Sequence, residues 1–295
     1  MYSDTHFHFR QTWQNSTQGN GKEFLQTMAE TNTFFGMDIG TEADDLISRR
    51  DFLIQAINTL DEKNKAVINK MIHFSAGIWP DPDSIRERES RMAILKEQIK
   101  SFCQPDQPFH DRLTAIGEGG IDHHWNPSGP DGRKEEDFDK DLLEGERELF
   151  HMQLDLAKSL NLPFIVHSRE GFKDTLDVIK AADSHCGIIH CYTYGIDEAK
   201  VFLDQGYYIS FSGSQTYTKK SKLQQTIDLI RYIPSDRLLL ETDAPYLTPV
   251  PLRGQVTNNP SLVKYTYSFV AQHRGISVEE LCNLVDSNCK TLFKL

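Results

Sequence analysis

The chain has few cysteines, no long apolar run and no basic segment at its N-terminus. Its five cysteines form an odd set without CxxC spacing, which argues against a disulfide framework: Cys103, Cys186, Cys191, Cys282 and Cys289. No stretch approaches the roughly 18 consecutive apolar residues of a membrane helix. The opening MYSDTHFHFR has no basic patch followed by an apolar core, as a secretory signal would. We therefore expect a cytoplasmic protein without a membrane partner.

Basic residues are also in short supply. Lys and Arg number 32 against 43 Asp and Glu, which gives a formal net charge of −11. Broad, charge-driven binding to nucleic acid depends on many Lys and Arg contacts to phosphate, so this balance disfavours it. Any action on nucleic acid has to be local. The 295 residues, 38% of them hydrophobic, suffice for a sizeable core, and without repeats we expect one domain over 1–295.

Short apolar or β-branched runs alternate with longer amphipathic segments. Helical spacing is seen in Leu46, Leu53, Ile57 and Leu60, and again in Leu223, Ile227 and Ile230. Strands that alternate with helices indicate parallel pairing, and eight such units match the size of a (β/α)8 TIM-type barrel. An open doubly wound sheet is the alternative, but the GxGxxG pattern that would favour it is absent. The eight runs are 2–8, 33–37, 72–78, 113–118, 163–167, 187–191, 207–212 and 238–243.

Potential metal ligands recur at the ends of these runs. His6 and His8 flank Phe7, and the period of two in a strand places both imidazoles on one face, together with Asp4. Because the carboxyl ends of barrel strands converge on one mouth, four imidazoles and two carboxylates there would form a site for one or two divalent transition metals. Taken singly, the histidines could be hydrogen-bonded core residues and the acids helix or turn caps. The later candidates are Glu118, His167, His190 and Asp243.

Taken together, the motifs resemble the TatD family of metal-dependent deoxyribonucleases. The matching pieces follow the family's order: DTHFH at 4–8, GEGGID at 117–122, LPFIVHSRE at 162–170, IIHCY at 188–192, SFSG at 210–213 and ETDAPYL at 241–247. The resemblance implies a barrel that hydrolyses phosphodiester bonds in DNA with two divalent ions (Zn, Mn or Mg). It also implies that His6, His8, Glu118 and Asp243 hold one ion and that His167 and His190 hold the other, with Glu118 bridging them.

The same residues suggest roles in the reaction. Asp243 is the candidate general base as well as a ligand, and Glu118 is the other candidate catalytic residue. Arg169 is suited to pair with a phosphate oxygen, with a surface ion pair as its alternative, and Tyr192 is suited to stack on a base or sugar, with core packing as its alternative. Where the family commonly has a histidine in Gly-x-His-Pro, this chain has Trp79, a third candidate for substrate contact.

The chain also departs from the family after Arg253-Gly254, where Gln255 and Val256 stand in place of basic residues. This departure weakens the assignment to nucleic acid more than the assignment to hydrolysis. The leading hypothesis is a metal-dependent deoxyribonuclease, more specifically an exonuclease acting on single-stranded DNA ends. The alternatives are a hydrolase of a small phosphoester, amide or lactone, and a metal-binding barrel without catalysis.

Overall fold

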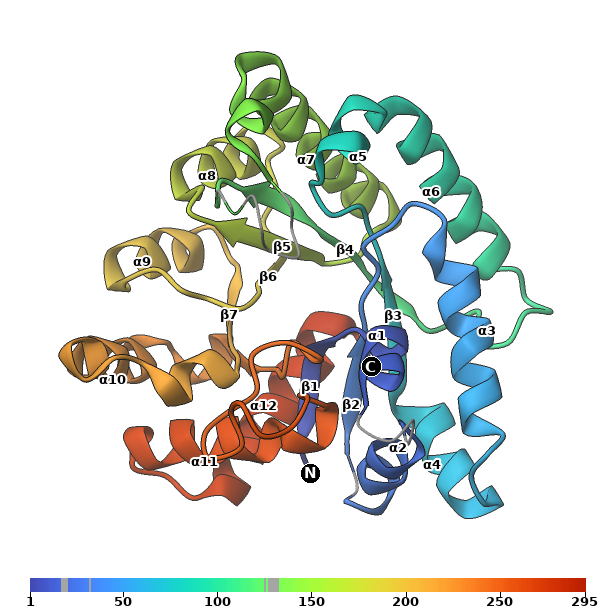
Figure 1. The fold of residues 1–295 in the computed structure, drawn as a ribbon, viewed down its shortest axis with the longest axis vertical. Coiled ribbons are helices and arrows are strands. Elements are labelled where there is room, and N and C mark those ends of the chain that lie inside the picture. The colour runs from blue at the N-terminus through green and yellow to red at the C-terminus, as the bar shows by residue number, and fades with distance from the viewer. Residues whose placement is uncertain (17–20, 32, 125, 127–132) are drawn as a thin grey trace.

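Eight parallel strands form the centre of the molecule in the computed structural model, which describes residues 1–16, 21–31, 33–124, 126 and 133–295 (Figure 1). Neighbouring strands pair in chain order. The strands are β1 (Ser3–Phe7), β2 (Phe35–Asp38), β3 (Ile72–Ala76), β4 (Leu113–Asp122), β5 (Phe164–Arg169), β6 (Gly187–Ile189), β7 (Tyr208–Phe211) and β8 (Leu238–Leu240).

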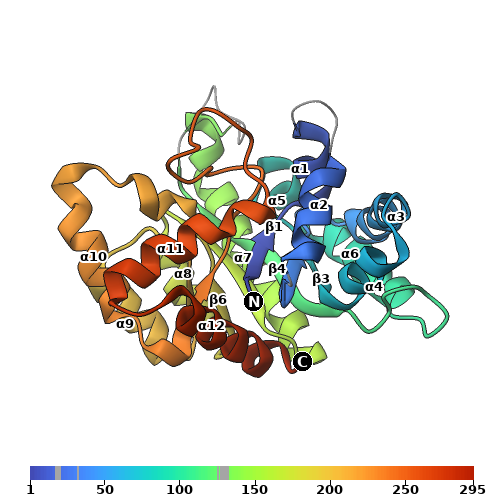
Figure 2. The same ribbon diagram turned by 90° about the horizontal axis from the view of Figure 1, so that it is seen from below.

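Helices lie on the outside of these strands (Figure 1). The segment between β8 and α11 arches over the same end of the barrel as α1 (Figure 2). Within the described ranges, no helix combines the length and apolar character needed to cross a bilayer. The α-helices are α1 (Phe9–Asn15), α2 (Gly21–Glu30), α3 (Asp45–Ile57), α4 (Glu62–Met71), α5 (Pro82–Arg86), α6 (Arg88–Phe102), α7 (Lys140–Leu160), α8 (Phe172–Ala181), α9 (Ile196–Asp204), α10 (Leu223–Tyr232), α11 (Val263–Arg274) and α12 (Val278–Phe293).

The barrel closes where the end of β1 meets the segment that follows β8. Phe7 forms a parallel bridge with Ala244. The His8 N–H donates to the Ala244 carbonyl at 2.8 Å, and the Asp243 N–H donates to the His6 carbonyl at 2.8 Å. These bonds fix Asp243 beside the two histidines, although they are more than 230 residues apart in the chain.

The predicted (β/α)8 barrel is confirmed, and each of the eight predicted runs overlaps one strand, with β2 and β5 ending one and two residues beyond their runs. The fourth strand differs, because β4 continues four residues beyond Glu118 to Asp122. Its pairing with β5 shifts register between Gly117 and Gly119, so Glu118 is the extra residue of a β-bulge. A bulge re-aims the side chain of the extra residue, which explains how Glu118 points into the mouth from the middle of a strand.

The two predicted helical stripes differ in accuracy. In α3, Leu46, Leu53 and Ile57 are buried as expected. In α10, Leu223 is 36% exposed, and the buried residues are Thr226, Leu229 and Ile230. Leu223 lies three residues before Thr226 on the same face of the helix, but at its first position, where the buried stripe has not yet begun. Of the predicted loop at 126–137, residues 127–132 lie outside the described residues, and the described part includes the start of a short 3₁₀-helix, Glu135–Phe138.

His73 in β3 gives the fold a predicted sensitivity to acid. Its ring is stacked on Phe35 with centroids 4.8 Å apart, and burial, aided by Arg112, lowers the pKa of His73 from 6.5 to about 3. Below pH 6.5 the unfolded chain therefore binds a proton that the folded chain does not. As the pH falls below 6.5, this one proton should therefore lower the free energy of unfolding by about 1.4 kcal/mol per pH unit.

The check is denaturant unfolding between pH 6.5 and 4.5. His73→Phe, which keeps the ring stack, should make the loss of stability with falling pH shallower by about one proton. His185→Phe is the matched control, since the His185 side chain is 61% exposed. An unchanged slope in His73→Phe would contradict the prediction.

Candidate active site

The six predicted ligands gather at the mouth of the barrel from five strands. His6 lies in β1, and His8 follows it directly. His167 lies in β5, His190 comes one residue after β6, and Asp243 comes three residues after β8. Glu118 reaches the cluster through the bulge in β4. The structure therefore brings all six side chains together, each from the carboxyl end of a strand or close to it.

Glu118 is the centre of the cluster. Its Oε2 atom lies 3.2 Å from His6 Nε2 and 3.9 Å from His8 Nε2. Its Oε1 atom lies 2.8 Å from His167 Nδ1 and 3.0 Å from His190 Nε2. One carboxylate oxygen thus faces the histidines of the first strand, and the other faces the histidines of the fifth and sixth.

Asp243 completes the side of the cluster formed by β1. Its Oδ1 atom lies 3.6 Å from Nε2 of His6 and 3.6 Å from Nε2 of His8. The residue has a left-handed backbone conformation with φ of 55°. This conformation is uncommon for a residue with a side chain and is concentrated at functional sites.

The charges in the cluster are strongly coupled. Burial alone would raise the pKa of the Glu118 carboxyl, but the neighbouring His190, His6 and His167 hold it well below its usual range. Burial alone would lower the pKa of His167, but Asp122 and Glu118 raise it to about 9. Glu118 is therefore ionised at neutral pH, which is the form in which a carboxylate binds metal ions.

Two further carboxylates, which the sequence interpretation did not assign, stand behind the histidines. Asp122 Oδ2 lies 2.9 Å from Nε2 of His167. Glu241 Oε1 lies 3.5 Å from Nδ1 of His190 and accepts a hydrogen bond from the Cys191 N–H at 2.7 Å. Metal-binding histidines commonly hold their second ring nitrogen against a carboxylate. Both residues lie in the quoted GEGGID and ETDAPYL motifs, which is the signal that could have identified them.

Buried polar contacts also hold the end of β1 in place. Asp38 accepts a hydrogen bond from the Phe9 N–H at 2.9 Å and pairs with Arg49 at 2.8 Å. Asp4 accepts hydrogen bonds from the N–H and the hydroxyl of Thr242 at 2.9 and 2.6 Å, and burial raises the pKa of Asp4 to about 8. Asp4, which the period of two places on the same strand face as His6 and His8, therefore ties β1 to the segment carrying Asp243.

The three predicted substrate contacts lie in different environments. The half-buried Trp79 packs edge to face on His167 with centroids 5.8 Å apart. The Arg169 side chain is 42% exposed, with Nη1 4.0 Å from Asp122 Oδ2. Tyr192 is buried, and its hydroxyl donates to the Gly195 carbonyl at 2.7 Å. Trp79 and Arg169 therefore flank the cluster, while the Tyr192 ring is packed inside the protein. A contact of any of these three residues with a substrate stays a prediction.

The donor set fits divalent metal ions. Potential ligand atoms of His6, Glu118 and His190 lie within 4.8 Å of one another, as do those of His6, His8 and Asp243. Across the described part of the chain, neither ring nitrogen of the buried His6 makes a hydrogen bond of good geometry, and His190 Nδ1 makes none either. Buried imidazoles without such partners, grouped with ionised carboxylates, are suited to coordinate transition metals.

Comparisons with known proteins identify the family to which the chain belongs. The family model described as TatD related DNase matches residues 3–294. The chain is 34% identical to the uncharacterized metal-dependent hydrolase YabD of Bacillus subtilis over 75% of this chain and 78% of that protein. It is 35% identical to a Pantoea vagans protein named 3'-5' ssDNA/RNA exonuclease TatD, over 62% of this chain and 66% of that one. The crystal structure of YJJV, a TatD homologue from Escherichia coli, superposes with a TM-score of 0.73 and 24% identity, covering 100% of this chain and 98% of that one.

Proposed function

Because this chain belongs to the TatD family of metal-dependent hydrolases, we propose that it cleaves phosphodiester bonds in DNA, as an exonuclease on single-stranded ends. The printed name of the Pantoea vagans relative, a 3'-5' ssDNA/RNA exonuclease, supports a nucleic-acid substrate. The acidic net charge of −11 favours a short, local contact with the strand over a broad electrostatic surface.

The division of Glu118 between two histidine pairs carries the proposal. With Oε2 toward His6 and His8 and Oε1 toward His167 and His190, the carboxylate is arranged to be shared by two ions. His6, His8 and Asp243 would hold one of them, and His167 and His190 would hold the other. Two such ions lower the pKa of a water molecule and stabilise the charge that develops on a phosphate in an in-line displacement.

The chain's own groups supply the rest of the chemistry. Asp243 directs Oδ1 toward the two histidines, and no hydrogen bond to its Oδ2 occurs among the described residues, so Oδ2 is free to accept the proton of the attacking water. Arg169, at the end of β5, is a cation suited to hold a non-bridging phosphate oxygen. Trp79 beside His167 offers a ring on which a terminal base can stack.

The test is a substrate panel on protein loaded with Zn²⁺, Mn²⁺ or Mg²⁺. We expect stepwise shortening of end-labelled single-stranded DNA, with slower cleavage of a fully paired duplex. Single-stranded RNA, a small phosphodiester, an amide and a lactone form the comparison arms. Hydrolysis of the lactone or amide without cleavage of any oligonucleotide would reject the nuclease and favour the alternative hydrolase, and no turnover of any substrate would favour a barrel without catalysis.

Asp122 acts in this proposal as a positioning residue for His167. Asp122→Asn keeps the shape of the side chain but removes the charge that fixes the imidazole 2.9 Å away. We expect the affinity of the site formed by His167 and His190 to fall about 10–100-fold, with the affinity of the site formed by His6 and His8 nearly unchanged. Metal titration followed by elemental analysis measures both.

Asp155→Asn is the matched control, since the Asp155 side chain is 60% exposed on α7. Equal metal binding by Asp122→Asn and Asp155→Asn would reject the positioning role of Asp122.

A further inference from the structure

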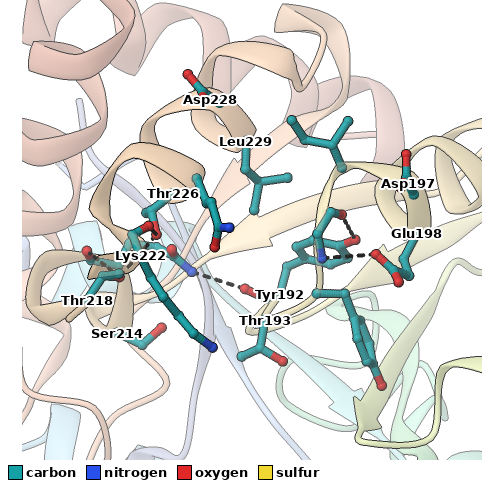
Figure 3. A pocket seen from close by; sticks show the side chains of 15 residues that line it. Tyr192, Thr193, Asp197, Glu198, Ser214, Thr218, Lys222, Thr226, Asp228 and Leu229 are labelled. Atoms are coloured by element: carbon teal, nitrogen blue, oxygen red, sulfur yellow. Dashed lines mark hydrogen bonds between the residues drawn. The ribbon is translucent and has the colours of Figure 1, made fainter. Parts of the chain in front are cut away.

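A cavity of about 560 Å³, lined by both polar and apolar side chains, lies between the start of α9 and α10 (Figure 3). One wall is the segment from Tyr192 into the start of α9, and the other runs from Ser214 into α10. The Gln215 side chain joins the two walls by donating to the Tyr192 carbonyl at 3.0 Å. The volume lies within the range of small-molecule sites, roughly 300–1,000 Å³.

The cavity wall and the candidate active site are joined by short segments of the chain, although none of the six predicted ligands lines the cavity itself. Tyr192 comes two residues after His190. Cys191, between them, lies with Sγ 3.4 Å from the Ser212 hydroxyl, which in turn lies 2.9 Å from the Ser214 hydroxyl on the cavity wall. The cavity wall therefore begins two residues after His190.

Several polar groups that line the cavity have no partner within the protein. Across the described ranges, no hydrogen bond or ion pair is formed by the Thr193 hydroxyl, the Lys222 ammonium or the Gln225 amide. Figure 3 shows the Lys222 side chain reaching toward Thr193 and Ser214. An ammonium with two hydroxyls is a donor set suited to a phosphate group.

The acidic residues of the lining lie at the other end. Asp197 and Glu198 stand at the start of α9, away from Lys222 in Figure 3. The Glu198 carboxylate accepts a hydrogen bond from the Gly195 N–H at 3.1 Å, whereas the Asp197 carboxylate accepts none in the part of the chain that is described. A carboxylate only accepts hydrogen bonds, so Asp197 suits the N–H groups of a base and repels a phosphate.

We propose that this cavity binds the nucleotide next to the scissile phosphodiester bond, a proposal that rests on the nuclease function. The phosphate of that nucleotide contacts Lys222, Thr193 and Ser214, and its base points toward Asp197. Lys222, together with Arg169 at the cluster, would let an acidic protein hold a strand without a broad basic surface.

The experiment measures binding apart from cleavage. Protein freed of metal with a chelator is titrated by calorimetry with dAMP and with inorganic phosphate, so that the ligand reports on side chains alone. We expect wild-type protein to bind dAMP more tightly than phosphate, and Lys222→Ala to weaken dAMP binding about 10-fold, the loss of one charged hydrogen bond. Lys219→Ala is the matched control, because Lys219 is exposed nearby but does not line the cavity.

The outcomes separate the cavity from the function. Equal dAMP affinity in wild type, Lys222→Ala and Lys219→Ala would overturn the cavity proposal even if single-stranded DNA is cleaved. Equal wild-type affinity for phosphate and dAMP would overturn it too, since it would indicate a plain anion site. Binding of dAMP that depends on Lys222, in a protein that cleaves no oligonucleotide, would support the cavity as a nucleotide site and reject the nuclease.

Discussion

Asp243→Asn is expected to lower turnover of single-stranded DNA by about 10²–10⁴-fold at saturating metal, the usual contribution of general acid–base catalysis. The substitution keeps the size of the side chain but removes the basic oxygen. Substrate binding should change less, because Arg169 and the cavity beside Lys222 are untouched. Steady-state kinetics with a labelled oligonucleotide separates the two effects as kcat against KM.

The geometry makes Asp243 suited to this role. Its carboxylate is 14% exposed and therefore reachable by water. Its backbone is fixed by the hydrogen bond from its N–H to the His6 carbonyl at 2.8 Å, so its Cα stays beside the cluster as long as the barrel is closed. The Tyr246 N–H bonds to the Asp243 carbonyl rather than to its side chain, so the carboxylate is not needed to form the turn.

The competing interpretation is that Asp243 only stabilises the turn before Pro245. In that case Asp243→Asn would lower the melting temperature and leave turnover near normal, and this result would reject the catalytic role. Asp236→Asn supplies the matched control, since the Asp236 side chain is 75% exposed before β8, at the opposite end of the same strand. It should alter neither quantity.

Glu118→Gln is expected to lower the metal affinity of both sites by about 100-fold or more. Losing a carboxylate that only hydrogen-bonds to a metal ligand typically costs about 10–100-fold in affinity, and losing a ligand itself should cost at least as much. The amide keeps the shape of the side chain but loses the charge that the two ions would share. Since each carboxylate oxygen faces a different pair of histidines, both sites should suffer together, and turnover should fall with them. Stepwise titration with Mn²⁺, with bound metal counted by elemental analysis, measures the two affinities.

His8→Ala is the informative comparison for Glu118→Gln. His8 Nε2 lies 3.6 Å from Asp243 and 3.9 Å from Glu118, on the β1 side of the cluster, so its loss should weaken one site only. Glu144→Gln, at an exposed position of α7, controls for the loss of one charge. If Glu118→Gln weakened only one site, as His8→Ala should, the bridging assignment would be wrong.

The strands of the barrel could be predicted from sequence because each is encoded locally. A buried parallel strand is a short apolar run, and every predicted run overlaps a strand, including the three residues of β8. The helix α10 was predicted less well. Its buried stripe starts at Thr226, a polar residue that local hydrophobicity does not place in a core, and only the packing of the helix against the barrel decides which face is covered.

The convergence of the six predicted ligands could also be anticipated, because parallel strands deliver their carboxyl ends to one mouth. His6, His8 and Asp243 needed only this rule and their place at the ends of apolar runs. Their chemical type, imidazole and carboxylate, was sufficient to suggest a metal site.

The sequence alone therefore determined the strands, the barrel and which six side chains meet at its mouth, since these depend on local pattern and on a general rule of topology. Only the tertiary structure decided how the set is arranged. The bulge that turns Glu118 inward exists through the pairing of β4 with β5, and the contact of Asp122 with His167 joins residues 45 positions apart. The cavity between Thr193 and Lys222 depends on two loops that meet only when β6 and β7 lie side by side. These contacts join segments that are far apart in the sequence. Spacing along the chain does not tell how close such segments come, because their distance is set only when the barrel closes.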